Sequence, residues 1–136
     1  MKALLVDVVT PQGVFLQGQA PMVVAKTADG ELGILPGHAP LAAILQPWAI
    51  RVGEKIFAAG EGFLHVKDGQ VRIIVDFAEA AETIDVALAQ QTREKAARML
   101  REGGADFDYA SAQRALQGAL ARLMAREEYL RRRSRE

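Results

Sequence analysis

The chain of 136 residues contains no cysteine, so it can form neither a disulfide framework nor a thiolate metal site. Its two histidines, His38 and His65, are too few and too isolated to build a zinc site without several carboxylates, and we expect no metal. No apolar run approaches the roughly 18–20 residues needed to cross a bilayer. The short apolar stretch at the N-terminus is interrupted by Asp7 and lacks a small-residue cleavage site, which argues against a signal peptide. We therefore expect a cytoplasmic protein, or one held at a membrane only through a partner.

Motifs for catalysis are also missing. The sequence has no G-x-x-x-x-G-K-S/T phosphate loop and no G-x-S-x-G elbow, and its only serines, Ser111 and Ser134, lie in the predicted helical part. Gly60-Glu61-Gly62 resembles the start of a dinucleotide fingerprint, but the third glycine is missing and a strand is predicted where a helix should follow. We predict that no residue of this chain is catalytic. Paired carboxylates are interpreted as solvated charges, as at Glu79 with Glu82 and Glu127 with Glu128.

Half of the residues are apolar and a quarter are charged, which is the composition of a globular protein rather than a disordered one. The formal charge is zero overall, but residues 1–83 hold six Lys/Arg against nine Asp/Glu, whereas residues 84–136 hold eleven against eight. This asymmetry favours a C-terminal part that meets an acidic surface. It is too mild to indicate nucleic-acid binding, which needs a dense basic patch.

Residues 1–83 show the pattern of an all-β domain, because short runs rich in Val, Ile, Leu and Phe alternate with turn residues. Asp29-Gly30 and Asp68-Gly69 are signals for type I′ hairpins, in which both central residues need positive φ, and Gly53-Glu54 is a weaker signal of the same kind. About ten short strands in 80 residues predict a β-sandwich or barrel, since a lone sheet could not bury its apolar face. The runs interpreted as strands are Ala3–Val9, Val14–Gln19, Val23–Thr27, Leu32–Leu35, Leu41–Leu45, Ala49–Val52, Ile56–Ala59, Gly62–Val66 and Val71–Phe77.

Residues 84–136 are predicted to form an antiparallel α-helical hairpin. This part has no proline and is rich in alanine and arginine, which favours helix. Asp85 is expected to cap the first helix, with Ile84 and Ala89 placed for a hydrophobic staple. Gly103-Gly104 is expected to end it, because glycine tolerates the left-handed cap conformation. Asp106 or Asp108 then caps a second helix that runs to about Arg133.

The apolar stripes of the two helices are weak. The first stripe is rich in alanine, and the second repeats every seven residues with small residues on its flank. Because alanine buries little apolar area, we expect the hairpin to be weakly held and able to open or re-dock. The first stripe consists of Leu88, Ala89, Thr92, Ala96, Met99 and Leu100, and the second of Tyr109, Ala112, Leu116, Ala119, Leu123 and Leu130.

Four segments of the sequence resemble one known family. The run GELGILPGHAPL, at Gly30–Leu41, resembles the hallmark loop of the epsilon subunit of F-type ATP synthases, whose mitochondrial counterpart is called delta. VDVVTPQGVFLQGQAPMVV, at the start of the chain, is similar to the family's first strands, and AGEGFLHV, at Ala59–Val66, to its late glycine-rich hairpin. The tail from AAETID onward matches the family's helical part in position and length.

The resemblance implies a non-catalytic rotor subunit of a proton- or sodium-translocating ATP synthase, bound at the cytoplasmic face of the cell membrane only through the complex. Its sandwich would bind the gamma subunit and the c-ring, with contacts near Thr10, Glu31 and His38. Its hairpin would fold against the sandwich or extend along the stalk and block ATP hydrolysis. When extended, a basic helix would face the alpha and beta subunits, through the beta-contacting residues Arg122, Arg126, Arg131, Arg132 and Arg133, followed by Arg135.

The resemblance also implies a nucleotide site, because some bacterial members bind ATP on the folded hairpin through an Ile-Asp-x-x-Arg-Ala motif. Ile84, Asp85 and Ala89 match this motif, but Leu88 stands where its arginine would be, and Gly118 stands at a second arginine position. Arginine is the residue best suited to bind phosphate. We therefore expect no required cofactor and at most weak regulatory binding of ATP. The remaining candidates for this weak site are Glu79 and Arg122, with Lys95 as a partial substitute.

Two alternatives remain at this stage. The chain could be a free-standing nucleotide-sensing or ligand-binding β-sandwich module, although the altered motif counts against it. It could also be an enzyme in which Glu31 and His38 act as an acid/base pair, although no nucleophile or metal group accompanies them. Co-purification with the other ATP synthase subunits separates the leading hypothesis from both.

Overall fold

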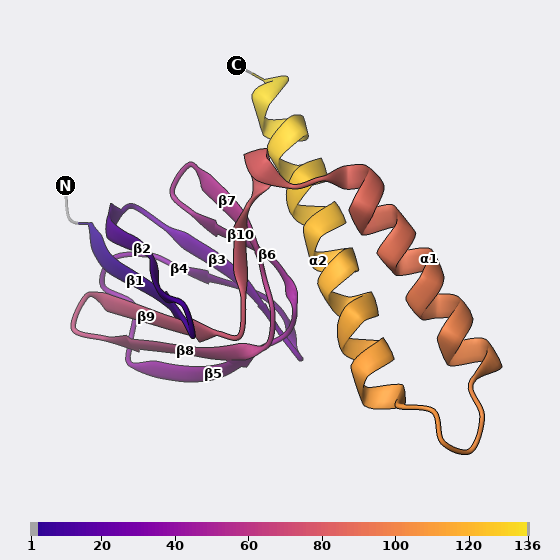
Figure 1. The fold of residues 1–136 in the computed structure, drawn as a ribbon. Helices are drawn as coiled ribbons and strands as arrows, with labels where there is room; N and C mark the ends of the chain where they lie inside the picture. The colour runs from indigo at the N-terminus through magenta and orange to yellow at the C-terminus, as the bar shows by residue number, and fades with distance from the viewer. Residues whose placement is uncertain (1–2, 136) are drawn as a thin grey trace.

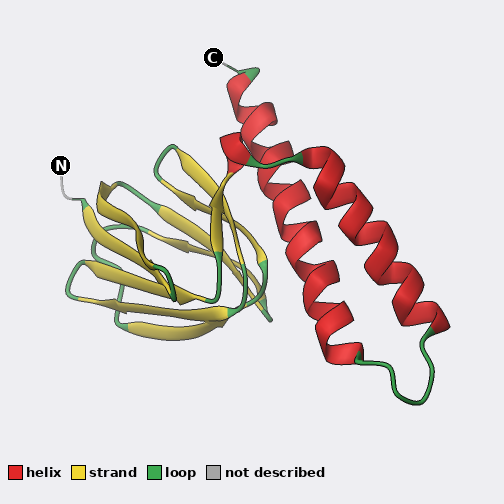
Figure 2. Ribbon diagram, in the orientation of Figure 1, coloured by secondary structure: helices red, strands yellow, loops and turns green. Residues whose placement is uncertain are grey.

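The computed structural model describes residues 3–135, and in that range ten strands are followed by one short 3-10 helix and two long helices (Figure 1, Figure 2). The predicted order of a β region and then a helical hairpin is confirmed. The strands are β1 (Leu4–Thr10), β2 (Gly13–Ala20), β3 (Val23–Thr27), β4 (Gly30–Ile34), β5 (Leu41–Leu45), β6 (Trp48–Val52), β7 (Lys55–Ala59), β8 (Gly62–Lys67), β9 (Gln70–Val75) and β10 (Ala78–Ala80). The helical elements are η1 (Ala81–Thr83), α1 (Val86–Glu102) and α2 (Tyr109–Arg133).

The strands form one continuous sheet that folds over into a sandwich. Their order is β10-β7-β6-β3-β5-β8-β9-β1-β2, and β4 pairs with β3 outside this path. The pairs are antiparallel except for β1 and β9, which run parallel with Val6 beside Val71. A single residue pair, Thr27 with Leu45, joins β3 to β5, so the sheet divides there into two layers.

Side chains that alternate along the strands fill the space between the layers. Val8 of β1 and Ile73 of β9 are fully buried, and Phe57 of β7 packs against Phe15 of β2 with the ring centroids 5.0 Å apart. Strand β7 is buried on both faces, because Phe57 lies in this core whereas Ile56 and Ala58 lie beneath α2. Within residues 3–135 no polar or charged residue is buried. The core of the sandwich is therefore entirely apolar.

The end of the predicted run Val71–Phe77 is wrong. Strand β9 ends at Val75, the chain bends at Asp76, and the short strand β10 follows. Alanine and glutamate have low β propensity. Because β10 consists only of Ala78, Glu79 and Ala80, it is a strand through its pairing with β7 and not through its own composition.

One of the predicted type I′ turns is confirmed and another is wrong. Asp68 and Gly69 both have positive φ, at 51° and 77°, as a type I′ turn requires. In the turn between β3 and β4, Gly30 has φ of 114° but Asp29 does not have positive φ. Thr27 pairs with Gly30, so the two loop residues are 28 and 29, and glycine follows the turn as the first residue of β4.

The helix caps are as predicted, but the physical reason for the end of α1 is different. The carboxylate of Asp85 accepts a hydrogen bond from the Leu88 amide at 3.1 Å, and that of Asp108, not Asp106, accepts one from the Ser111 amide at 3.0 Å. Gly103 is not left-handed, with φ of −55° and ψ of 149°. A Cβ at Gly103 would overlap the Phe107 ring. Glycine here therefore leaves room for the Phe107 ring and does not form a left-handed cap.

The predicted stripe of α2 is confirmed at its two alanines, Ala112 and Ala119, which are buried, but not at its large residues. Tyr109 and Leu130 are each 49% exposed. The buried face is made of small residues, which let helices and sheet approach closely. These residues are Ala112, Gly118, Ala119, Ala121 and Ala125.

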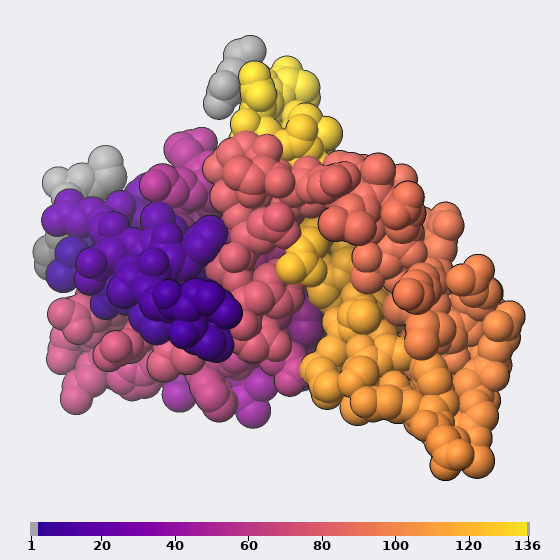
Figure 3. Space-filling view, viewed as in Figure 1, coloured from indigo at the N-terminus to yellow at the C-terminus, as the bar shows by residue number. Residues whose placement is uncertain are grey.

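Helix α2 lies between the sandwich and α1 (Figure 1, Figure 3). It packs on the outer face of β6 and β7, where Ala121 and Ala125 join Ile56, Ala58 and Ile84 in a small apolar cluster. On its other side it packs against α1, whose buried residues are Ala89 and Ala96. Ile84 thus belongs to the contact with the sheet. In the described part of the chain neither helix is long and apolar enough to cross a membrane.

Candidate partner surfaces and nucleotide site

Glu31 and His38 lie on β4 and on the loop that follows it. Glu31 faces Lys26 across the β3–β4 hairpin. In the loop, the His38 amide donates to the Leu35 carbonyl at 3.1 Å, and the left-handed φ of 88° at Gly37 turns the chain between them. These contacts give the loop a defined shape, which presents Leu35 with 57% of its surface exposed.

Thr10 ends β1 at a tight turn. Its hydroxyl donates to the Gly13 carbonyl at 3.2 Å and accepts a hydrogen bond from the Gln12 amide at 3.2 Å. In the described range no hydrogen bond joins Thr10 to Glu31 or His38. Thr10 therefore belongs to a second ordered loop and is not bonded into the first.

A row of exposed apolar side chains crosses one outer face of the sandwich, and sequence reasoning missed it. Ile44 of β5 lies opposite Phe63 of β8, and Phe63 lies opposite Ile74 of β9. Ile74 is beside Val9 of β1, and Val9 is opposite Val14 of β2. The exposed fractions of Ile44, Phe63, Ile74 and Val14 are 72, 61, 46 and 62%. Five neighbouring strands span roughly 19 Å at the usual spacing.

A contiguous apolar row of this kind is typical of a protein–protein contact surface. The next row on the same face is polar: His65 lies opposite Arg72, Arg72 beside Asp7, and the Asp7 carboxylate accepts a hydrogen bond from the Gln17 amide nitrogen at 2.8 Å. The signal was present in the sequence as strands that carry apolar residues on both faces. Only the register of the paired strands shows that these residues lie side by side in one row.

Four of the five predicted nucleotide-site residues surround one cavity of about 250 Å³ between β10, α1 and α2. Ile84 is the exception, because it is buried beneath α2. The full lining consists of Glu79, Asp85, Leu88, Ala89, Thr92, Ala119 and Arg122. Small-molecule sites usually have volumes of roughly 300–1,000 Å³, so this cavity is small for a nucleotide.

The charged groups of this cavity are already partnered. Arg122 Nε donates to Glu79 Oε1 at 2.6 Å, and the guanidinium carbon of Arg122 lies 4.2 Å from the centroid of the Phe77 ring. The Asp85 carboxylate caps α1. Leu88 lies at the rim with 58% of its surface exposed and offers no charge to a phosphate.

The arginines near the end of α2 also form contacts within the chain. The Glu128 carboxylate accepts hydrogen bonds from Arg131 and, at 3.0 Å, from Arg132 Nε. The bond from Arg131, followed by that from Arg132, lowers the pKa of Glu128 and outweighs partial burial, while Glu128 raises the pKa of Arg131. Arg133 Nη1 donates to the Tyr129 hydroxyl at 3.4 Å. At the other end of α2, the Ser111 hydroxyl and amide lower the pKa of Asp108.

Metal chemistry has no candidate in residues 3–135, because no group of three or more His, Cys, Asp or Glu side chains is placed to hold an ion. The structure thus combines a β-sandwich with two ordered loops, an apolar outer row and a docked helical hairpin. These features define a two-part, protein-binding subunit.

The chain belongs to the ATP synthase delta/epsilon chain family. Residues 3–81 match the family's beta-sandwich domain and residues 82–127 its long alpha-helix domain. The chain is 43% identical over 131 residues to the ATP synthase epsilon chain of Moorella thermoacetica, covering 92% of this chain and 97% of that one. It is 42% identical over 138 residues to ATP synthase epsilon chain 2 of Ralstonia nicotianae, covering 98 and 99%. The predicted resemblance to the epsilon subunit, a non-catalytic subunit of the ATP synthase stalk, is confirmed.

Solved structures agree on the fold. A chain in the structure of the Euglena gracilis mitochondrial ATP synthase, which comprises OSCP, F1 and the c-ring, superimposes with a TM-score of 0.77 at 22% identity, covering 97% of this chain and 81% of that one. A chain of the central stalk and c-ring of the Tetrahymena thermophila mitochondrial enzyme gives a TM-score of 0.56 at 18% identity. At these identities the likeness concerns the fold alone.

Proposed function

We propose that this chain is a rotor subunit that joins the gamma subunit to the c-ring and restrains ATP hydrolysis through its hairpin. In this proposal residues 1–83 bind the stalk and the ring, and residues 84–136 form the regulatory part. The subunit is held at the cytoplasmic face of the membrane only through the complex, which translocates protons or sodium ions. The observation that carries the proposal is the exposed apolar row that contains Ile44, Phe63 and Ile74, together with the family of the chain.

The apolar row is the proposed contact with gamma, and the loops that contain Thr10, Glu31 and His38 are the proposed contacts with gamma and the c-ring. Phe63 lies in the middle of the row between Ile44 and Ile74. Central aromatic residues commonly dominate interface energies, at about 2 kcal/mol or more. We therefore expect Phe63→Asp to weaken binding to gamma by about 30-fold or more.

Co-purification and titration test this contact. The wild-type chain should purify in stoichiometric complex with alpha, beta and gamma, and Phe63→Asp should not. Met99→Asp is the matched control, because Met99 is also an exposed apolar residue, at 41%, but lies on α1. If Phe63→Asp binds gamma as tightly as the control, the apolar row is not the contact.

The hairpin is the part that we propose inhibits ATP hydrolysis. Both buried residues of α1 are alanines, so we expect little apolar area between α1 and α2, whereas α2 also covers Ile56 and Ala58 of the sandwich. Deletion from about Thr83 onward should leave a folded sandwich that still binds gamma, and ATP hydrolysis by the reconstituted complex should rise. Because the deletion exposes Ile56, its solubility is measured alongside. Loss of sandwich folding would contradict a separable regulatory part.

We further propose that ATP binds this chain weakly or not at all. The support is the small cavity, the neutral Leu88 at the motif's arginine position, and the carboxylate of Glu79 that already occupies Arg122. Calorimetry on the isolated full chain should detect no tight binding of ATP. Tight binding would show that the cavity opens and that Arg122 exchanges partners.

A further inference from the structure

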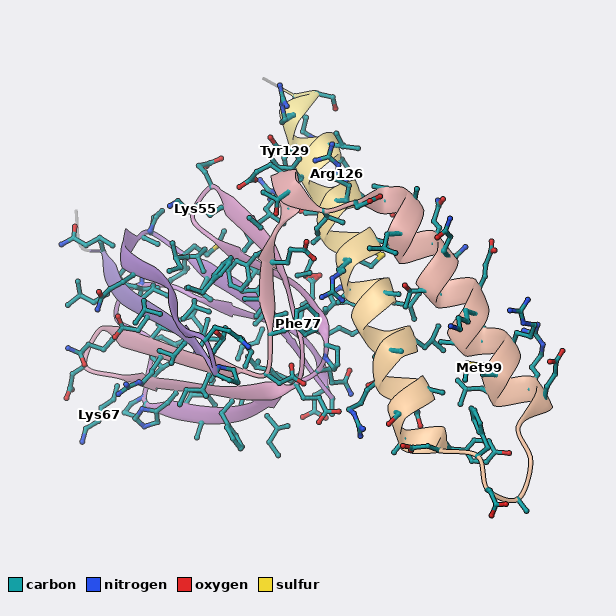
Figure 4. The ribbon with its side chains drawn as sticks, viewed as in Figure 1. Lys55, Lys67, Phe77, Met99, Arg126 and Tyr129 are labelled. Atoms are coloured by element: carbon teal, nitrogen blue, oxygen red, sulfur yellow. The ribbon has the colours of Figure 1, made fainter. Side chains whose placement is uncertain are left out.

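Two arginines of α2 reach the segment that joins the sandwich to the hairpin. Arg122 Nε donates to Glu79 Oε1 at 2.6 Å, and Arg126, one helical turn later, donates from Nη1 to the Ala81 carbonyl at 3.2 Å. Glu79 is in β10 and Ala81 begins η1. Figure 4 shows Phe77 between the strands and α2, and Arg126 farther along α2, beside the connection that leads to α1. The last helix therefore holds the chain at the point where the helical part leaves the sheet.

Phe77 and Gly118 shape this contact. The Arg122 guanidinium stacks on the Phe77 ring, with its carbon 4.2 Å from the centroid. A Cβ at Gly118 would lie 3.1 Å from Arg122 Nη1 and 3.7 Å from Phe77 Cε1. A larger residue at 118 would press on the stacked arginine. The glycine that departs from the nucleotide motif is thus the residue that makes room for the stack.

The contact between Arg122 and Glu79 is weak enough to break and re-form. The side chains of Arg122 and Glu79 are 35 and 34% exposed, so solvent screens the ion pair. Stacking on Phe77 and the bond from Arg126 to a carbonyl strengthen the same small region. An ion pair of this exposure and one cation–π contact together favour the docked arrangement by about 5- to 10-fold.

We propose that Glu79, Arg122, Phe77 and the Arg126–Ala81 bond form a ligand-independent latch that keeps the hairpin docked. The carboxylate of Glu79 takes the place at Arg122 that an anionic ligand would take, so docking needs no nucleotide. This deepens the proposed function, on which it depends for the hairpin being a mobile brake.

The latch also makes docking and inhibition compete for the same side chains. Arg122 and Arg126 are two of the arginines that would face the beta subunit when the hairpin extends. Each guanidinium is held by the linker segment while the hairpin is docked. Extension therefore requires that both bonds break before either arginine can bind elsewhere.

Hydrogen exchange of the isolated full chain, in nucleotide-free buffer, tests the latch. Glu79→Gln and Arg122→Gln should each speed exchange in α1 and α2 by about 5-fold, with the strands unchanged. The exchanged pair Glu79→Arg with Arg122→Glu should recover part of the lost protection. Arg98→Gln is the control, because Arg98 is an exposed arginine of α1 that forms no ion pair within residues 3–135. The wild-type helices should already be protected in this buffer, without ATP.

Two results would overturn the proposal. In the first, the helices of Glu79→Gln and Arg122→Gln exchange as slowly as those of the Arg98→Gln control. This would show that the Glu79–Arg122 pair does not stabilise the docked hairpin. In the second, the helices of the wild type are unprotected in nucleotide-free buffer and become protected only on addition of ATP, which would show that docking depends on a ligand. Neither result bears on binding to gamma, which the Phe63→Asp titration measures separately, so failure of the latch and failure of the proposed function are distinguishable.

Discussion

The sandwich and the hairpin bury different kinds of side chain. Between the two layers of the sheet, branched and aromatic residues such as Ile73 and Phe57 are fully buried. Beneath α2 and between the helices, most buried residues are alanine, such as Ala89, Ala119 and Ala121, with Ile56 and Ile84 as larger exceptions. Since apolar stabilisation scales with buried area, we expect the sandwich to be strongly held and the hairpin to be weakly held. The rotor subunit that we propose, whose hairpin moves while its sandwich stays bound, would require that difference.

The largest expected effect is in the sandwich core. Phe57→Ala removes a ring that is 1% exposed and that packs on Phe15, so it should lower the free energy of unfolding by about 3–5 kcal/mol. Denaturant titration followed by tryptophan fluorescence of Trp48 measures it. Met99→Ala, at an exposed helical position, should change stability little. A loss in Phe57→Ala no greater than in this control would mean that the core is not the scaffold.

Overpacking beneath α2 should separate the two regions. Ala121 is fully buried between α2 and the sheet, and Ala121→Leu should destabilise the docked hairpin by about 1–3 kcal/mol. Hydrogen exchange should show faster exchange in α1 and α2 with the strands unchanged. Equal acceleration in strands and helices would show that the two regions unfold as one unit.

Loss of a helix cap should have a smaller effect, confined to α1. Asp85→Ala removes the acceptor for the Leu88 amide and should cost about 1 kcal/mol. Far-ultraviolet circular dichroism should report a small loss of helix, and Asp85→Asn, which can also cap, should retain most of it. Equal losses in both variants would indicate that the charge matters and not the cap.

The smallest effect concerns acid. The pKa values of Asp108 and Glu128 are lowered in the folded chain by Ser111 and by Arg131, so their contribution to stability is present above the unfolded value of about 4 and is lost as the pH falls through the folded value. Acidification from about pH 5 to about pH 3 should therefore loosen both ends of α2 before the strands, whose core contains no charged residue in the described range.

Exchange measured at the two pH values tests this, with Asp108→Asn and Glu128→Gln as controls. Asparagine still caps a helix but does not titrate there, so the N-terminal turn of α2 should lose its pH dependence. If the first turn of Asp108→Asn loosens with acid as the wild type does, another group is responsible.

Local patterns predicted the elements of both regions better than their contacts. Branched runs located nine strands, and Asp85 marked the start of α1, because these signals act within a few residues. Strand β10 was not predicted, because its alanines form a strand only through pairing with β7. The predicted stripe of α2 contained the buried Ala112 and Ala119, but its large residues are not the buried ones, because the buried face consists of alanine and glycine.

The candidate sites show the same limit. The motif around Ile84 and Asp85 predicted a nucleotide site, and four of the five residues expected there line one cavity. The bond between Glu79 and Arg122 joins positions 43 residues apart, and no periodicity reports such a pair. The apolar outer row likewise depends on the register of five strands.

The parallel pairing of β1 with β9 sets the order in which a chain leaving the ribosome can fold. Val6 finds its neighbour Val71 only after nearly the whole sheet has been synthesised, so closure of the sandwich is a late, long-range event. The surface around Ile56 and Ala58 then stays bare until Ala121 and Ala125 emerge. During that interval the nascent subunit carries two uncovered apolar surfaces, one that its own last helix will cover and the other the row that we propose binds gamma.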